Sequence, residues 1–346
     1  MPPSTVNATS DGHTFSPALR DQQREVNALY EQVPELAERG REEFRKLFEA
    51  GHAQWDSGST QTALESFGAA YVMARELNYR LGEGMAVERA ALCYRVLGEH
   101  TRALTMLQGA VRLFEAQADT AAMASALINL AQTHAELGQL PEAARAFEQS
   151  RRAASRLYDV PLEIAALVKG AMVELRRESA SDAVRLLGQA LGLTVASGNT
   201  TEEVRVLQRL AAAHGVLAEA WHKASRAYES VREAPAPAEG ADETDGVPRE
   251  SPCASTEDSG SAEEERGMPV AGEDAWAKYE EATLGAVRIL ERAAKLTEQL
   301  EHGEELRLQV FRQLRAHYKR LEDDSAVTRC ERDIDQLSEL LSSQQG

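Results

Sequence analysis

Histidine and cysteine are the side chains of this sequence that could supply metal-binding or nucleophilic chemistry. The chain contains 8 histidines and 3 cysteines, and His134 and His214 hold equivalent positions in a repeating pattern. Equivalent positions of separate repeats lie apart along the molecule, so the two rings are not expected to share a metal ion. Cys93 lies among alanines with no base placed near it by the sequence. This setting favours a buried structural thiol over a nucleophile.

Short catalytic motifs do not add to these side chains. The sequence contains no glycine-rich phosphate-binding loop, no His-Glu-x-x-His and no nucleophile elbow. Its carboxylates are dispersed at the spacings of solvated helix faces. We therefore predict no catalytic residue, no cofactor-binding residue, no metal ligand and no cofactor, and we expect that the protein is not an enzyme.

The charge of the chain disfavours two classes of partner. With 38 basic and 56 acidic residues, it has a formal net charge of -18, which argues against binding to nucleic acid or to anionic membranes. No uncharged stretch is long and apolar enough for membrane insertion, and we expect no secretory signal at the amino terminus. The cysteines form neither a metal-binding spacing nor an even disulfide framework, which favours a reducing compartment. A cytoplasmic protein is the expected result.

A period of forty residues organises the middle of the chain. Leu97-Gly98 recurs forty residues later as Leu137-Gly138, and Ser57-Gly58 stands forty residues earlier. Around these glycines, small and large apolar residues return at offsets of three and four, as on one face of a helix. The small positions include Ala63, Ala103, Ala143 and Ala183 and then Gly51, Ala91, Ala131, Ala171 and Ala211, and the large ones include Phe67, Leu107, Phe147 and Leu187.

Each period predicts a helix, a tight turn at the glycine and a second antiparallel helix, with small residues where the helices approach closely. The pattern resembles the tetratricopeptide repeat (TPR), best from Asn129-Leu130-Ala131 to Leu137-Gly138 and through Glu142-Ala143-Ala144 to Phe147. The resemblance implies an all-α, right-handed helical-hairpin solenoid of about five repeats. The long period is similar to that of adaptor-type TPR proteins. The fifth repeat fits least well, because its register slips by one residue near Trp221.

The composition divides the chain into five expected parts. These are a disordered amino terminus at 1–15, amino-terminal helices at 16–43, the TPR solenoid at 44–233, an acidic disordered linker at 234–272 and carboxy-terminal helices at 273–346. The linker segment contains ten acidic and two basic residues and five of the 11 prolines. Such a composition cannot bury enough apolar surface to offset the loss of chain entropy on folding.

The carboxy-terminal part returns to helical spacing, with breaks expected at Gly303 and Asp323-Asp324. Three helices result, and we expect them to cap the end of the solenoid, because terminal repeats of a solenoid need a cover. A separate bundle is the alternative. Apolar residues at 327, 334, 337 and 341 have a coiled-coil-like spacing and could instead pair with another chain.

Binding is expected on the inner surface, because the first helix of every hairpin lines the concave side of such a stack. The candidate groove residues are Arg45, Phe48, His52, Met85, Glu88, Arg89, Leu92, Ile128, Asn129, Gln132, Val168, Lys169, Met172, Arg205, Gln208 and Arg209. The middle of this set is apolar, and one row of it contains the basic residues Arg89, Lys169 and Arg209. This combination suits an amphipathic helix or an extended peptide with acidic flanks.

The sequence is compatible with two functions. The first is a scaffold or adaptor that performs no chemistry and binds a partner protein in the groove. The second is a structural or self-assembling subunit, a homo-oligomer formed through the carboxy-terminal helices, whose groove is filled by its own chain.

Overall fold

The computed structural model describes residues 34–232, 272–300 and 302–344, and every regular element in these ranges is an α-helix. The chain forms two compact units, Met1–Val173 and Glu174–Gly346. The expected disordered amino terminus and, apart from Gly272, the expected acidic linker lie outside the described residues. Residues 16–33 of the expected amino-terminal helices also lie outside them.

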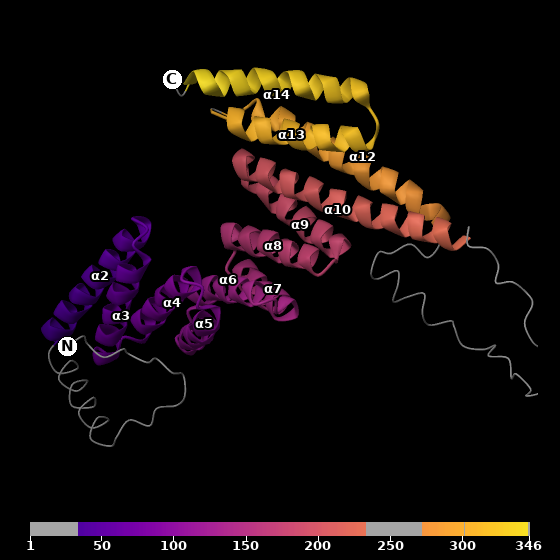
Figure 1. Cartoon of the computed structure of the whole chain (residues 1–346). Coiled ribbons are helices and arrows are strands. Elements are labelled where there is room, and N and C mark those ends of the chain that lie inside the picture. Colours follow the sequence, from indigo (N-terminus) through magenta and orange to yellow (C-terminus); the bar gives the residue numbers. More distant parts are fainter. Residues whose placement is uncertain (1–33, 233–271, 301, 345–346) are drawn as a thin grey trace, which may run out of the picture. The chain divides into compact units, whose positions relative to one another are not determined.

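The first unit consists of helical hairpins in chain order (Figure 1). Its helices are α2 (Pro34–Asp56), α3 (Thr60–Glu76), α4 (Arg80–Val96), α5 (His100–Ala116), α6 (Thr120–Glu136), α7 (Leu140–Arg156) and the part of α8 (Val160–Arg176) that ends at Val173. From α3 to α8 each helix has 17 residues. Turns of three residues separate them. Two such helices and two such turns account for the forty-residue period.

Left-handed backbone conformations end these helices at every turn. Within the hairpins the residues are Gly58, Gly98 and Gly138, with φ of 79°, 81° and 75°. Glycine adopts these angles without the steric cost that a Cβ atom brings. Between the hairpins the corresponding residues are Asn78, Ala118 and Tyr158, which the glycine pattern of the sequence did not reveal.

The expected interface positions form the core. The small residues Ala63, Ala103 and Ala143 are fully buried, and the large residues Phe67, Leu107 and Phe147 are at most 3% exposed. Ser150 occupies a small position, and its hydroxyl donates a hydrogen bond of 2.7 Å to the carbonyl oxygen of Ala124 on the neighbouring helix α6. Burial of these residues confirms the predicted hairpin faces.

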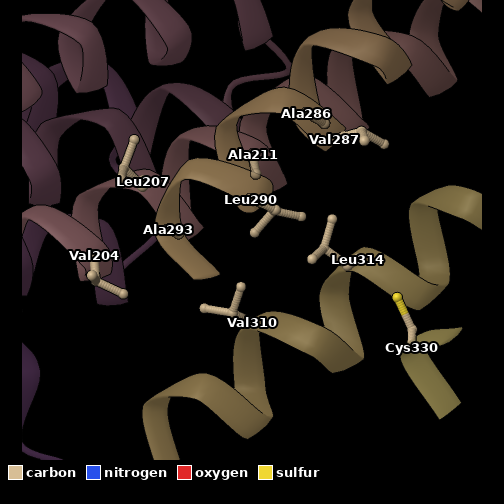
Figure 2. Close-up of a cluster of buried hydrophobic side chains, with 10 residues drawn as sticks. All are labelled: Val204, Leu207, Ala211, Ala286, Val287, Leu290, Ala293, Val310, Leu314 and Cys330. Atoms are coloured by element: carbon tan, nitrogen blue, oxygen red, sulfur yellow. The ribbon is translucent and has the colours of Figure 1, made fainter. Parts of the chain in front are cut away.

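The second unit begins at Glu174 and contains α9 (Ala180–Ser197), α10 (Thr200–Arg232), α12 (Gly272–Thr297), α13 (Glu304–Arg320) and α14 (Asp324–Gln344). A single core joins four of these helices (Figure 2). It contains Val204, Leu207 and Ala211 of α10, Ala286, Val287, Leu290 and Ala293 of α12, Val310 and Leu314 of α13, and Cys330 of α14. As predicted, Gly303 lies between α12 and α13, directly before α13, and Asp323-Asp324 lies at the boundary between α13 and α14.

The fifth hairpin differs from the prediction. The pattern places its turn at residue 218, but α10 continues through that position as one helix of 33 residues. Ala218 stands there between Leu217 and Glu219, and all three residues favour helix over turn. The predicted second helix of the fifth hairpin is therefore a continuation of α10. Helix α12 packs along α10 in its place.

Two glycines in helix interiors provide a matched test of the packing. A Cβ atom at Gly84 on α4 would lie 2.7 Å from Cε1 of the buried Phe114, whereas one at Gly109 on α5 would have no atom within 4 Å. We expect Gly84→Ala to lower the free energy of unfolding by about 1–3 kcal/mol through overpacking. Gly109→Ala should raise it by roughly 0.5–1 kcal/mol through helix propensity.

Urea unfolding of the full chain, followed by circular dichroism, measures both effects. Equal responses to the two substitutions would contradict the close approach of α4 and α5 at Gly84.

Candidate functional site

The residues singled out for chemistry are placed in the core rather than in a reactive site. The Cys93 side chain is fully buried, as predicted, and burial raises the pKa of its thiol to about 11. A thiol in that state is a poor nucleophile at neutral pH. His134 is buried, with Nδ1 lying 2.6 Å from Oε1 of Gln139. Among the described side chains, no three His, Cys, Asp or Glu residues form a group that could hold a metal ion.

The first helices of successive hairpins lie next to one another in the first unit. Phe48 of α2 packs against a buried cluster to which α3 contributes Ala63 and Phe67 and α4 contributes Ala90 and Cys93. Helix α4 contacts α6 directly, and Ala131 of α6 and Ala166 of α8 belong to one buried cluster. The expected candidate residues of α2, α4, α6 and α8 therefore belong to neighbouring helices of one unit.

These candidates fall into two groups by burial. Leu92, Ile128, Val168 and Glu88 are buried between helices of the first unit. The other candidate residues of the first unit retain accessible surface. They are Arg45, Phe48, His52, Met85, Arg89, Asn129, Gln132, Lys169 and Met172. Met172 is 44% exposed. The apolar middle of the predicted groove is thus mainly core, and Met85 and Met172 are its accessible methionines.

A buried hydrogen bond joins α4 to α6 at the centre of this surface. The Asn129 amide donates to Oε1 of Glu88 over 2.7 Å, although the two residues are 41 positions apart. Burial raises the pKa of the Glu88 carboxyl, and the bond from Asn129 and the charge of Arg89 oppose that shift. The pair fixes the relative register of α4 and α6, because a buried carboxyl group without a donor would be costly.

Arg89 is a partly accessible cation whose charge acts on Glu88. Its guanidinium also acts on His52 of α2, whose pKa is lowered by burial and, to a lesser extent, by Arg89. The His52 ring contacts the rings of Phe48 and Phe67, with centroids 4.8 Å and 5.5 Å away. Arg89 therefore brings positive charge to the middle of the α2, α4 and α6 surface, beside a histidine that favours its neutral form.

A second polar connection lies further along the same two helices. Arg95 of α4 donates to Oε1 of Gln132 over 3.3 Å and forms an ion pair of 3.8 Å with Glu136 of α6. Gln132 was a candidate, whereas Arg95 and Glu136 were not. Arg95 follows Leu92 by three residues, and Glu136 follows Gln132 by four. Residues at these spacings share a helix face, so the spacing could have identified both.

The remaining candidates belong to the second unit. Gln208 is buried, and Arg205 and Arg209 are exposed on α10. Arg205 forms an ion pair of 3.4 Å with Glu202 on the same helix.

The coiled-coil-like residues of the carboxy-terminal helix face inward in part. Val327 and Ile334 of α14 are 9% and 8% exposed, and α14 contacts α13. These two side chains are thus used within the chain and are not available for pairing with a second copy.

Comparison with known proteins identifies the hairpins. A family model described as tetratricopeptide repeat matches residues 83–156, which include most of α4 and all of α5, α6 and α7. Residues 83–156 are tetratricopeptide repeats. None of the curated protein sequences matches the chain.

Solved TPR structures share this fold at low sequence identity. A variant form of a Podosopora anserina putative kinesin light chain with nearly identical TPR-like repeats is 13% identical, with a TM-score of 0.50 over 76% of this chain and 96% of that one. BtubC (BKLC) from P. vanneervenii is 15% identical, with a TM-score of 0.51 over 83% of this chain and 92% of that one. TPR solenoids present extended binding surfaces, so this fold indicates a role in protein interaction.

No described helix combines the length and apolar character needed to cross a bilayer.

The Glu88–Asn129 contact can be tested by two substitutions of different kind. Glu88→Gln retains an acceptor for Asn129 but removes a carboxyl group whose ionisation is opposed by burial, so the variant should be more stable than the natural protein at pH 7. Asn129→Ala leaves Glu88 without its donor and should lower the free energy of unfolding by about 1–3 kcal/mol.

Thermal unfolding of both variants at pH 7 and pH 5 measures these effects. The advantage of Glu88→Gln should shrink at the lower pH, where the natural carboxyl group is more readily protonated. An advantage that grows with acidity would contradict this account of Glu88.

Proposed function

We propose that this protein is a non-enzymatic adaptor that binds a partner protein on the first-helix surface of its first unit. That surface consists of the accessible residues of α2, α4, α6 and α8 up to Val173. The single observation that carries the proposal is the direct contact between α4 and α6, in which Asn129 donates a hydrogen bond to Glu88 across two consecutive TPR hairpins.

The chemistry of the surface favours a partner with carboxylates. Arg89 and Lys169 supply positive charge in a protein whose net charge is -18, and Arg45 is paired with Glu42 on α2. An acidic segment is repelled by most of such a molecule, and it gains charge-assisted hydrogen bonds only where cations gather. The partner we propose is therefore an amphipathic helix or extended peptide with acidic flanks.

Apolar contact is the smaller part of this recognition. Leu92, Ile128 and Val168 are 5–9% exposed and so offer little area to a ligand. Met85 and Met172 retain surface, and methionine adapts its shape to different partners. We therefore expect that the bound peptide buries few apolar side chains and that its affinity falls strongly as the ionic strength rises.

The unpaired cysteines suit this role inside a cell. Cys93 and Cys330 are buried and free, and free thiols persist in a reducing compartment. We propose the cytoplasm as the location of the adaptor.

Charge reversal on the proposed surface tests the function. The probe is a set of fluorescently labelled acidic amphipathic peptides, titrated with the full chain and measured by anisotropy at low and at physiological salt. We expect Arg89→Glu and Lys169→Glu each to weaken binding by about 1–3 kcal/mol, as is usual for hydrogen bonds to charged groups.

Arg145→Glu is the matched control, because Arg145 is exposed on the second helix α7 and pairs only locally with Glu142 over 2.8 Å. Its affinity should equal that of the natural protein. Absence of binding by every peptide, or equal loss in all three variants, would refute binding at the first-helix surface.

A further inference from the structure

Two histidine rings are packed against glycines in the interior of the second unit. A Cβ atom at Gly285 of α12 would lie 3.6 Å from Nδ1 of His214, which belongs to α10. A Cβ atom at Gly215 of α10 would lie 3.1 Å from Cε1 of His317, which belongs to α13. Each imidazole thus occupies space that a glycine on another helix leaves open. The pair links α10, α12 and α13.

Neither ring has a hydrogen-bond partner at Nδ1. Both Nδ1 atoms are buried, and no acceptor or donor reaches them from the described residues. The whole side chain of His317 is 6% exposed. A buried imidazole without a partner tolerates the neutral form, whereas the cation would lose its hydration without gaining an acceptor.

The charged groups around the pair also disfavour protonation. Arg320 of α13 lies beside His317, and a Cβ atom at Gly215 would be 3.0 Å from its Nη1 atom. The carboxylate of Glu219 of α10 is already paired with Arg320. The hydroxyl of Tyr279 of α12 donates to the Arg320 carbonyl oxygen over 3.4 Å, and the ring of His222 of α10 lies 5.1 Å from the Tyr279 ring.

These surroundings set the titration of both rings. Burial first, then the charges of Arg320 and His214, lower the pKa of His317 to about 4. Burial also lowers the pKa of His214. Neither shift requires a nearby metal or ligand.

We propose that the His214–His317 pair is an acid-sensitive contact, which holds α13, and with it α14, against α10 and α12 when neutral and releases them when protonated. The carboxy-terminal helices are the part that moves, because His317 is the buried titratable group of α13 that packs against α10. The core of Figure 2, the Arg320–Glu219 ion pair and the hydrogen bond from Tyr318 to Glu291 also join α13 to α10 and α12, so protonation loosens this packing. The device controls how much of α10 and α12 is accessible. It is independent of the peptide-binding surface of the first unit.

The direction of the effect follows from proton linkage. An exposed histidine has a pKa of about 6.5, so the released state takes up protons more readily than the packed state. Stability from this contact is complete above that value and is lost as the pH falls from about 6.5 toward about 4. A shift to about 4 at His317 alone reduces the packing equilibrium constant up to about thirtyfold between pH 7.5 and pH 5.

Hydrogen–deuterium exchange of the full chain at pH 7.5, 6 and 5, corrected for intrinsic exchange, tests the proposal. Protection of α13 and α14 should fall at least tenfold on acidification, whereas that of α4 and α5 should remain unchanged. His317→Leu should strongly reduce this pH dependence and leave only the smaller part that His214 contributes. His302→Asn is the matched control, because His302 is exposed in a turn with a φ of 59°, which asparagine tolerates.

If His317→Leu does not fold, a second measurement on the natural chain still tests the proposal. Imidazole resonances of His214 and His317 in NMR spectra should titrate below the pH of about 6.5 that is usual for an exposed histidine. Titration of both rings at about 6.5 would overturn the proposal. So would unchanged protection of α13 and α14 at pH 5, or an unchanged loss of protection in His317→Leu.

Discussion

Close approach of helices at glycine and alanine is the interaction on which the first unit depends. Phe67 of α3 fills the space beside Gly51 of α2, where a Cβ atom would come within 2.6 Å of the ring, and Phe114 of α5 does the same beside Gly84 of α4. Each large side chain is therefore fixed by the absence of a side chain on its neighbour. Hairpins packed in this way place their first helices in contact, and the charges of the proposed binding surface follow from that placement.

The repeating part of this arrangement could be predicted from the sequence. Small and large apolar residues alternate within each helix and return forty residues later, which specifies the helices, the turns and the pairing of the helices. The buried positions of Ala103 and Leu107 agree with that pattern. The pattern failed in the fifth hairpin. The fourth hairpin also lacks the glycine, yet its chain turns at Glu178 with a φ of 62°, whereas α10 continues through Ala218 as one helix that packs along α12.

The burial of a candidate residue was harder to predict than its equivalence to residues forty positions away. The period correctly grouped Glu88 with Ile128 and Val168, but all three are buried, because burial is set by the size of side chains on adjacent hairpins. The same limit hid two polar arrangements. Glu88 and Asn129 are separated by 41 residues, and His214 and His317 lie on helices whose packing no repeat specifies. Such contacts depend on the folded geometry.

Binding at the first-helix surface is tested most directly by finding which helices a bound peptide covers. Hydrogen–deuterium exchange of the full chain, with and without a saturating acidic amphipathic peptide, locates that contact. We predict slower exchange in α4, α6 and the part of α8 up to Val173, with α5 and α7 unchanged. Slower exchange confined to α5 and α7, or to the second unit, would contradict binding at the first-helix surface.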